Sequence, residues 1–562
     1  MFKRQAFIFA AAATLITACG RDCGQRTIEY PCFGYTNAHS DVTCVRLTDT
    51  ATFVTLRAKY FPHNWILWAK STTLVTGGKS YPIKGGIGMT PGEYIWMNDA
   101  GDSTFTMVFD PIPLSSKKID LDEGIESRSF IINDIDITGS KRPKKVNPVF
   151  KDKAVSSGPV SFDESIATST INVHLVNFRE GMSPEVNLHY DSVVGGQQSL
   201  AGSVDGNGNA TFVFTQRGSY SFVVQYRPEI WCEGAVAPGE TLDVFLDLAL
   251  SGQVVMAQCR DGYKIDRSLY SRISGGKYSG LKFRTDLPYF GIFTPDIFPD
   301  CTIDADSYYD ALMSEYRTFV SGLDSLGQDG NARKTAEMTA RQALMTGMVY
   351  SGRILKNNYM LQHPELNWDD PLPFTPAQTG KKHFDSLLKE VDFNDPDLLI
   401  YGTRLSDLIN PTGQAVRNGW ITEGRLYEIG KAQEYFMAAK NGGLTPGQIE
   451  ELSEFEWAFL REALISIDTE AKEFLQNKHA EYNAVAEWPG AEKWMQDLVA
   501  PYRGKVVMID LWDTWCGPCC AALSENEPYK KGELSSDDIV WIYIADESSS
   551  LTKYLDMIKD IR

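Results

Sequence analysis

The chain has 562 residues, of which 43% are hydrophobic and 23% are charged, and its formal net charge is −19. A chain of this length exceeds what one hydrophobic core supports, so we expect about three to four domains. Nucleic-acid binding needs clustered lysines and arginines, and the acidic balance argues against nucleic acid as a partner. An acidic surface otherwise supports solubility and identifies no partner.

The first residues have the pattern of an export signal. Lys3 and Arg4 precede an apolar run from Ala6 to Ile16, and small residues then lead to Cys19. The run is shorter than the about 20 apolar residues of a membrane-spanning helix, so we predict a signal peptide over residues 1–18. The cysteine at the cleavage point resembles that of a bacterial lipoprotein signal, which implies that Cys19 is lipidated. An ordinary signal peptide with an incidental cysteine is the alternative.

No later stretch is apolar enough to cross a membrane. We therefore expect the mature chain to be lipid-anchored to a membrane of the cell envelope, with its bulk in water and facing the periplasm or the cell surface.

Export also affects how the 10 cysteines are interpreted. In an oxidising compartment cysteines tend to pair, and pairs among the first three after Cys19 and between Cys232 and Cys259 are candidates, although spacing does not fix the connectivity. A structural zinc site would need a second C-x-x-C or an H-x-x-x-H, and the sequence has neither beside these cysteines, so we expect no metal and no cofactor. Beyond Cys19 and the pair discussed below, the cysteines are Cys23, Cys32, Cys44, Cys232, Cys259, Cys301 and Cys520.

Residues 19–45 are predicted to form a Cys-containing linker, and residues 46–140 a β-rich domain. Within this domain Phe53–Ala58 and Ser103–Phe109 alternate apolar and polar residues in the period-2 manner of half-buried strands. Glycine pairs and a Pro-Gly step predict turns at Gly77-Gly78, Gly85-Gly86 and Pro91-Gly92.

A Lys- and Pro-rich linker from Gly139 to Pro159 precedes a second β region, and we predict a β-sandwich-like domain over residues 160–260. Ile171–Leu175 alternates clearly, and short strands recur at the spacing typical of a sandwich. The run Asp205–Asn209 predicts a hairpin turn, because a calcium loop would also need a glutamate at its twelfth position.

Residues 301–485 switch to helical periodicity and are predicted to be a helical region. The segment Thr445–Tyr482 is predicted to be one long helix, opened by proline in its first turn. Apolar stripes at helical spacing are typical of a packed core rather than of a cofactor site. The two stripes are Tyr308, Leu312, Tyr316, Phe319 and Leu323, and Phe455, Phe459, Leu464, Ile467 and Phe474.

The most informative feature is the segment Trp515-Cys516-Gly517-Pro518-Cys519, which follows an apolar strand at Lys505–Trp512. A C-x-x-C at a strand-to-helix junction predicts a dithiol/disulfide switch. If a helix begins at the motif, its free N–H groups and its dipole favour the thiolate of Cys516 over the thiol. Cys519 lies one turn on and would resolve a mixed disulfide, while Pro518 fixes a backbone angle between the two cysteines.

Asp510 adds a second candidate to this site. Along an extended strand Met508, Asp510 and Trp512 point to one face, and a carboxylate in so apolar a run is expected to be partly desolvated. Beneath the cysteine pair it could accept the proton of Cys519 as that thiol attacks. Solvation of Asp510 at the strand end is the alternative.

The string Ile509–Cys519 closely resembles thioredoxin-like proteins, and the exported, multidomain TlpA-like thiol–disulfide oxidoreductases of Gram-negative envelopes fit best. The resemblance implies that Asp510 is the buried aspartate of that family and that Trp515 to Cys519, with Gly517 and Pro518 between the cysteines, form its active-site turn. It further implies disulfide-containing envelope proteins as substrates and a membrane protein as the electron donor. The Gly-Pro pair resembles the reducing members.

Two departures from the family affect this prediction. The sequence offers a helix at Ala521–Lys530, a strand at Ile539–Ile544 and a helix from Ser550 to Lys559, but no counterpart of the family's cis-proline loop, last two strands and closing helix. Either the sequence is a fragment, which we favour, or the redox domain is crippled. Cys520, next to Cys519, could also mispair.

The predicted architecture is therefore multidomain, with N-terminal all-β, sandwich-like domains, a helical middle region and a partial α/β thioredoxin-like fold over residues 500–562. A surface or envelope binding lipoprotein with a vestigial thioredoxin-like end is the alternative function.

Overall fold

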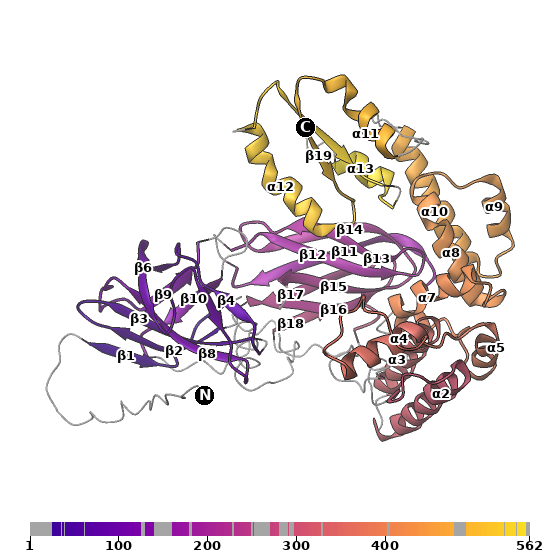
Figure 1. Ribbon diagram of the computed structural model, residues 1–562, viewed down its shortest axis with the longest axis horizontal. Coiled ribbons are helices and arrows are strands. Elements are labelled where there is room, and N and C mark those ends of the chain that lie inside the picture. The colour runs from indigo at the N-terminus through magenta and orange to yellow at the C-terminus, as the bar shows by residue number, and fades with distance from the viewer. Residues whose placement is uncertain are drawn as a thin grey trace. The chain divides into compact units, whose positions relative to one another are not determined.

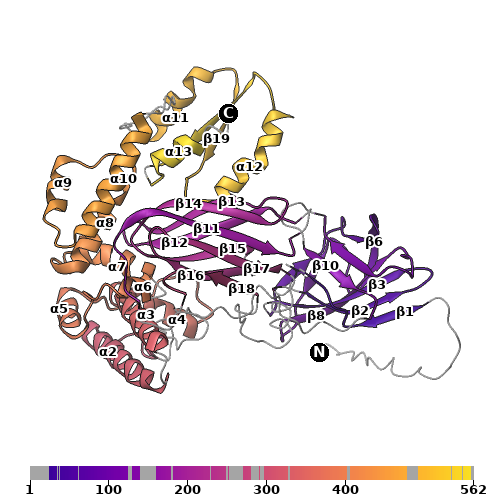
Figure 2. The same ribbon diagram turned by 180° about the vertical axis from the view of Figure 1, so that it is seen from behind.

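The computed structural model describes residues 25–557, with gaps at 35, 37, 39, 61, 125–129, 140–159, 179–181, 228–229, 249–250, 252–269, 280, 282–289, 291–296, 327–329, 402–404, 477–490, 533 and 547. The chain is multidomain, mostly β in its N-terminal region and helical in its C-terminal half (Figures 1 and 2). It divides into two compact units, of which the first comprises residues 1–151, 175–183 and 246–271 and the second the remainder. The predicted signal peptide, the lipidation site Cys19 and most of the Lys- and Pro-rich linker lie outside the described residues.

The first unit is built on an antiparallel sheet whose inward apolar side chains form one hydrophobic cluster. The predicted strands Phe53–Ala58 and Ser103–Phe109 are confirmed, since they lie in two strands that pair along their whole length. The eight described strands of this sheet, in spatial order, are β1 (Arg26–Glu29), β2 (Ser40–Leu47), β3 (Thr52–Lys59), β8 (Asp102–Phe109), β6 (Lys79–Ile87), β5 (Thr73–Thr76), β9 (Lys118–Asp122) and β10 (Ile131–Asp136).

Two of the three predicted turns in this unit are confirmed. Gly77-Gly78 joins β5 to β6 with both residues at positive φ, +57° and +74°, and Gly92 turns the chain at φ +83°. The turn predicted at Gly85-Gly86 is wrong, because both residues lie inside β6 beside a register shift against β8. A Cβ at Gly86 would collide with Met89, which follows the strand, so the glycine provides space for this close approach.

A two-stranded sheet completes the first unit. It pairs β4 (Trp65–Leu67) with β7 (Tyr94–Trp96) antiparallel, and Trp65 lies opposite Trp96. Ile66 and Ile95 point into the hydrophobic cluster, whereas Trp65, Tyr94 and Trp96 face outward.

The second unit begins with a β-sandwich. One sheet holds β14 (Asn209–Arg217), β11 (Ile166–Val176), β17 (Thr241–Asp247) and β18 (Ser271–Ser274), and the other holds β13 (Gly196–Ser203), β12 (Glu185–Ser192), β15 (Tyr220–Arg227) and β16 (Ile230–Val236), both in spatial order. Tyr190 stacks on Phe214 with ring centroids 5.5 Å apart and so joins the two sheets. The predicted hairpin turn is confirmed, because Asp205 accepts the N–H groups of Asn207 and Asn209, each at 2.9 Å.

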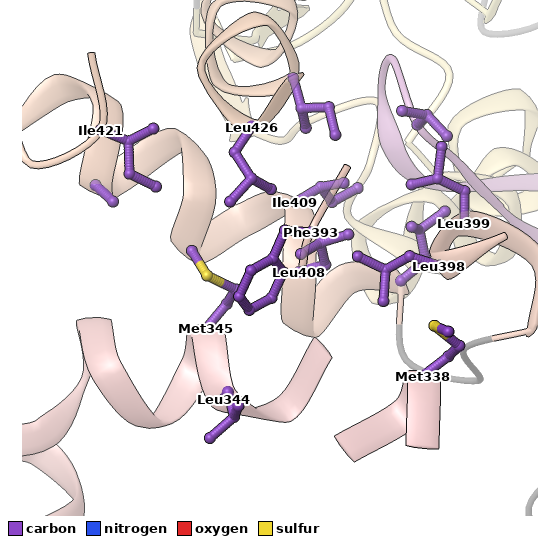
Figure 3. Close-up of a cluster of buried hydrophobic side chains, with 14 of the residues drawn as sticks. Met338, Leu344, Met345, Phe393, Leu398, Leu399, Leu408, Ile409, Ile421 and Leu426 are labelled. Carbon is purple, nitrogen blue, oxygen red and sulfur yellow. The ribbon is translucent and has the colours of Figure 1, made fainter. Parts of the chain in front are cut away.

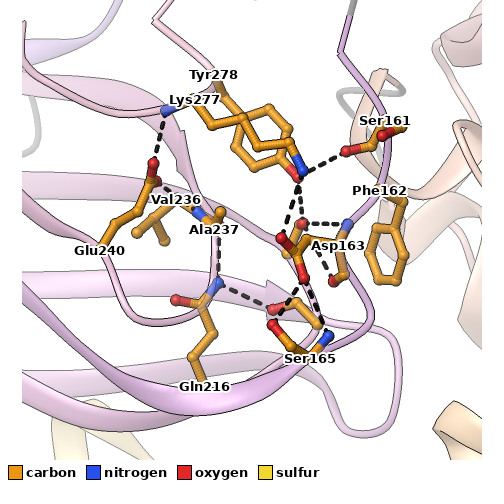
Figure 4. A network of polar contacts seen from close by, with 12 residues as sticks. Ser161, Phe162, Asp163, Ser165, Gln216, Val236, Ala237, Glu240, Lys277 and Tyr278 are labelled. Carbon is orange, nitrogen blue, oxygen red and sulfur yellow. Dashed lines mark hydrogen bonds and ion pairs between the residues drawn. The ribbon is translucent and has the colours of Figure 1, made fainter.

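A polar network holds two segments against the end of the sandwich (Figure 4). Tyr278 donates to the carbonyl of Ser161 at 2.9 Å, and Asp163 accepts the hydroxyl of Ser165 at 2.7 Å and the ammonium of Lys277 at 3.4 Å. Burial opposes the ionisation of Asp163, yet these donors hold its pKa below the usual value. Burial also raises the pKa of Tyr278 to about 12.

Helices follow the sandwich and pack against apolar residues at its edge. Apolar residues of the sandwich, among them Val193 and Ala235, belong to the same cluster as the helical residues drawn in Figure 3. The predicted stripe Tyr308–Leu323 is confirmed as core, with Phe319 partly buried. The described helices are α2 (Ala305–Gly322), η5 (Leu323–Leu326), α3 (Gly330–Val349), α4 (Ser351–Gln362), α5 (Lys381–Glu390), α6 (Leu398–Tyr401), α7 (Leu405–Arg417), α8 (Gly424–Lys440), α9 (Pro446–Ser453) and α10 (Ala458–Gln476).

The single helix predicted over Thr445–Tyr482 is wrong. Its start is as expected, since Thr445 caps α9 in a capping box with Gln448, but the helix ends at Ser453 and α10 begins at Ala458. The buried carboxylate of Glu428 accepts the backbone N–H groups of Glu456 and Trp457 at 2.6 and 3.0 Å. These bonds satisfy donors at the start of α10, so the break is stabilised from another helix.

Helix α7 continues through Pro411, which lies inside it. Proline has no N–H, so the carbonyl of Asp407, four residues earlier, loses its partner within the helix. Thr346 of α3 donates its hydroxyl to this carbonyl at 3.0 Å and supplies the missing bond.

The C-terminal elements are α11 (Ala491–Val499), η6 (Ala500–Tyr502), β19 (Val506–Leu511), α12 (Gly517–Lys531), β20 (Ile539–Ile544) and α13 (Leu551–Met557). Strands β19 and β20 pair in parallel. The predicted strand Ile539–Ile544 is confirmed, and the predicted helix Ala521–Lys530 lies within α12. The side chain of Asn441, which follows α8, accepts the N–H of Leu551 at 2.8 Å and links α13 to the helical region.

Candidate functional site

The candidate site lies where β19 ends. Its apolar sequence, rich in valine and isoleucine, forms a strand, and the parallel ladder with β20 places Asp510 beside Tyr543 and Leu511 beside Ile544. The ladder continues for one bond beyond the strand, from the N–H of Trp512 to the carbonyl of Ile544 at 2.9 Å. The chain then leaves the sheet toward the cysteines.

A serine-rich loop after β20 fixes the segment between the strand and the cysteines. Ser549 accepts the N–H of Thr514 at 3.0 Å and donates to Asp513 at 2.9 Å, and the N–H of Ser550 donates to the Thr514 hydroxyl at 3.2 Å. Thr514, Ser549 and Ser550 are all buried. The Trp515 indole donates to Ser548 at 2.8 Å while its ring stays exposed. Sequence reasoning missed these serines, although a run of three serines four residues after the end of a strand is a signal for such turns.

Cys516 and Cys519 are joined by a disulfide at the start of α12, with their Cα atoms 5.2 Å apart. Cys516 is the N-cap residue, and its sulfur accepts the N–H of Cys519 at 3.3 Å. The Cys516 carbonyl accepts the N–H of Cys520 at 3.0 Å and so begins the helix. Free N–H groups and the helix dipole therefore face the Cys516 sulfur and favour negative charge there when the disulfide is reduced.

Asp510 lies on the same side of the sheet as α12. Residues paired across a parallel ladder share a face, so Asp510 points as Tyr543 does. Lys530 of α12 lies over the rings of Trp541 and Tyr543, at 5.0 and 4.5 Å, which places α12 over this face. The Asp510 side chain is half-buried and forms no hydrogen bond or ion pair with the residues that the structure describes.

Strand alternation predicts that Trp512 points to the same face as Asp510, but the two side chains have different surroundings. The strand ends at Leu511, and the Trp512 ring is 2% exposed and stacks on Tyr554 of α13 with centroids 5.6 Å apart. Its indole N–H is buried and has no hydrogen-bond partner among the residues that the structure describes.

The remaining cysteines fall into two groups. Cys520 donates its thiol to the Asp513 carbonyl at 3.8 Å, and burial raises its pKa. Cys44 and Cys301 carry free thiols, and burial, with the charge of Glu29, raises the pKa of Cys44 to about 11. Cys44 therefore takes no part in the candidate pairs among the first cysteines. The other predicted pairings involve Cys23 or Cys259, which lie outside the described residues, as does the side chain of Pro518.

Within the described part of the chain, no three His, Cys, Asp or Glu side chains are grouped so that they could hold a metal ion. In the same residues no helix has the length and apolar character needed to cross a membrane.

No protein-family model and no curated protein sequence matches this chain. Solved structures match it only weakly. The pullulanase type I of Bacillus subtilis str. 168, complexed with maltose, is 12% identical over 37% of this chain and 24% of its own, with a TM-score of 0.14. The pullulanase of Anoxybacillus sp. LM18-11 is 11% identical over 34% of this chain and 25% of its own, with a TM-score of 0.15. The Bacillus anthracis TIE protein is 12% identical over 39% of this chain and 50% of its own, with a TM-score of 0.11.

The aligned part thus spans about a quarter of each of these two pullulanases and half of the TIE protein. Similarities at these TM-scores establish neither a common fold nor a common function.

Proposed function

We propose that the protein is a lipid-anchored thiol–disulfide oxidoreductase of the cell envelope that reduces protein disulfides through Cys516 and Cys519. The observation that carries the proposal is the disulfide between these cysteines at the N-terminus of α12, directly after a strand of a parallel sheet. The resemblance of the surrounding sequence to TlpA-like, thioredoxin-like proteins supports the same chemistry. The lipoprotein-like signal ending at Cys19 supports the location.

The residues suit a two-step exchange. In the reduced protein the Cys516 thiolate attacks one sulfur of a substrate disulfide, which forms a mixed disulfide and releases one substrate thiolate. The Cys519 thiolate then attacks the Cys516 sulfur, releases the second substrate thiolate and leaves the Cys516–Cys519 disulfide. Asp510, on the face that α12 covers, takes the proton that Cys519 loses. Two electrons from a dithiol protein of the membrane restore the reduced pair.

Insulin reduction by the full chain, with dithiothreitol as the electron source, tests the proposal. We expect Cys516→Ser to react at the uncatalysed rate, because the attacking sulfur is gone. Cys301→Ser, which removes a buried thiol elsewhere, is the matched control and should keep the wild-type rate. Equal rates for the wild type and Cys516→Ser would refute the oxidoreductase function.

The role of Asp510 has its own test. We expect Asp510→Asn to lower the rate of insulin reduction at least about tenfold, since general-base catalysis contributes that much or more. The exposed Asp538, next to the partner strand, provides the control Asp538→Asn. An Asp510→Asn rate equal to that of the control would remove Asp510 from the mechanism.

Lipid attachment at Cys19 can be tested in cells. Labelled palmitate should enter the wild-type protein and not Cys19→Ala, and the variant should leave the membrane fraction. Labelling of both proteins would contradict attachment at Cys19.

A binding lipoprotein is the second candidate, and one observation favours it. A cavity of about 560 Å³ among α3, α4 and α7 is lined by polar and aromatic side chains that include Tyr350, Arg353, Asn357 and Trp368. Thermal unfolding with a panel of small sugars and carboxylates tests this function. A ligand-dependent rise in Tm that Arg353→Ala abolishes, together with insulin reduction that does not depend on Cys516, would favour it over the oxidoreductase.

A further inference from the structure

We propose that the outward face of the two-stranded sheet β4–β7 binds a neutral polysaccharide, whose sugar rings stack on Trp65, Tyr94 and Trp96. This aromatic face belongs to the first unit and does not depend on the thiol chemistry proposed for the second.

The aromatic face is exposed, yet its support is fully buried. Trp65, Tyr94 and Trp96 are 44%, 56% and 60% exposed, whereas the alternating residues Ile66 and Ile95 are each 5% exposed and belong to the core cluster. The buried side chains of Trp68 and Met97 extend the same inward rows. Large aromatic side chains gathered on one water-facing surface mark an interaction site, and a firmly anchored backbone presents them in fixed positions.

The three rings form one cluster in which neighbouring rings lie against each other. Trp65 and Tyr94 have centroids 4.1 Å apart with an angle of 35° between their planes, and Tyr94 meets Trp96 at 6.3 Å and 82°. Proline-rich peptides insert their rings into aromatic-lined grooves, and rings already in contact leave no slot between them. A ligand of this face therefore stacks on the ring faces that point away from the cluster and not between the rings.

The aromatic face lacks the cluster of cations that an anionic polymer needs. Neither strand carries a charged residue, and the exposed charges beside them are of both signs: Glu93 directly precedes β7, Lys70 lies near Gly92, and His63 approaches Asp99 to 3.6 Å. Single-stranded nucleic acids and anionic lipids both need clustered Lys and Arg beside the aromatic side chains. A neutral ligand matches this surface better than either.

A sugar is uncharged and can stack on an aromatic ring, which are the two properties that this surface favours in a ligand. One face of a pyranose ring presents C–H groups, whose partial positive charge suits the negative face of an aromatic ring, and the ring edge carries hydroxyls. Hydrogen-bonding groups flank the rings, since His63 and Asp99 are 74% and 99% exposed. The backbone at His63 has a positive φ of +60°, which turns the chain directly before Trp65.

Affinity electrophoresis of the full chain in gels containing amylopectin, xylan, mannan or galactan tests the proposal. We expect at least one of these polymers to retard the wild type. Each loss of a ring, in Trp65→Ala and in Trp96→Ala, should weaken that retardation about tenfold, as for other stacked ligands. Trp96→Phe should retain most of the binding and Trp96→Leu should not, because stacking needs a ring and not merely an apolar side chain.

The control is Tyr529→Ala, which removes an exposed aromatic ring of α12 and should leave the retardation unchanged. Insulin reduction by the ring variants should equal that of the wild type, which separates this surface from the proposed thiol site. Retardation by none of the four polymers would overturn the proposal, as would equal binding by Trp96→Leu and Trp96→Phe. Ring-dependent binding to phosphatidylcholine vesicles or to decaproline, without binding to any of the polymers, would also overturn it.

Discussion

The aromatic face of the first unit and the two-stranded sheet β19–β20 of the second both expose large apolar side chains, but they differ in what lies behind them. In β4–β7 the outward residues are exposed or, at Leu67, half-buried, and the inward ones are anchored in the core. In β19–β20 no residue of either strand is fully buried, and Val506, Met508 and Leu511 are 56%, 41% and 68% exposed. The sheet β4–β7 is packed on one face and open to water on the other, whereas β19–β20 is only partly packed on both faces.

The difference separates two causes of apolar exposure. A parallel sheet needs cover on both faces, and the described residues cover β19–β20 incompletely, so its exposure reflects missing packing. The exposure of β4–β7 occurs on a strand pair that is otherwise well packed, and it therefore points to a ligand. The two surfaces should respond differently to substitution.

The largest effect should come from the buried residue that adjoins the exposed sheet. We expect Trp512→Ala to destabilise the C-terminal elements by about 3–5 kcal/mol, because it removes a large ring packed on Tyr554. Leu511→Ala, one residue earlier and 68% exposed, should change stability by less than about 0.5 kcal/mol. Hydrogen exchange of the peptides covering 505–512 and 539–544 measures both, and similar effects of the two substitutions would show that β19–β20 is packed on more than one side.

The same contrast can be drawn at β4–β7. Ile95→Ala should destabilise the first unit by about 2–5 kcal/mol, since the side chain is 5% exposed and leaves a cavity. Trp96→Ala, its neighbour on the outward face, should have a much smaller effect on urea unfolding. A large loss of stability in Trp96→Ala would mean that the ring serves folding, which would weaken its assignment to binding.

A smaller effect is expected where the C-terminal elements meet the helical region. Asn441→Ala removes the acceptor for the Leu551 N–H, and loss of such a cap costs about 1 kcal/mol. Exchange of the α13 amides should accelerate accordingly. Asn418→Ala, after α7, is the control, and unchanged exchange in Asn441→Ala would show that α13 is held without this contact.

The smallest effect is the pH dependence that buried Glu123 gives to the stability of the first unit. Burial raises the pKa of Glu123 above its ordinary value of 4.5, although its carboxylate accepts the N–H groups of Ala69 and Phe130, each at 2.9 Å. The folded state therefore binds more protons than the unfolded state between pH 4.5 and the raised value, so stability should fall as pH rises through that window. In Glu123→Gln the decline should disappear from urea unfolding measured across the same range. Persistence of the decline would assign it to another group.

Much of the local structure follows from the sequence pattern, and the exceptions have identifiable causes. The period-2 alternation at Ser103–Phe109 predicts β8 because one face of that strand is buried and the other is not. The helical pattern across 445–482 misses the break after Ser453, because the acceptor that stabilises it, Glu428, comes from a different helix. Gly86 lies within a strand, and a Cβ there would collide with Met89, three residues later. A tertiary contact such as that of Glu428 leaves no signal in the segment that it stabilises.

In the candidate site, too, the local sequence predicts some features, while others depend on tertiary contacts. The C-x-x-C spacing and the strand before it predict the positions of Cys516 and Cys519, and strand alternation predicts the face of Asp510. The contacts of Asp513 and Thr514 with Ser549 and Ser550 depend on the parallel pairing of two strands and could not be predicted from either segment alone.

Thr346 donates its hydroxyl to the Asp407 carbonyl, so the effect of a substitution at position 346 depends on which residue occupies position 411. Thr346→Val should be harmful beside Pro411, because it removes a hydrogen bond from the partly buried Asp407 carbonyl, and nearly silent in Pro411→Ala, where the helix recovers its own donor. The two positions are therefore epistatic, and a valine at 346 is better tolerated once the proline has been replaced.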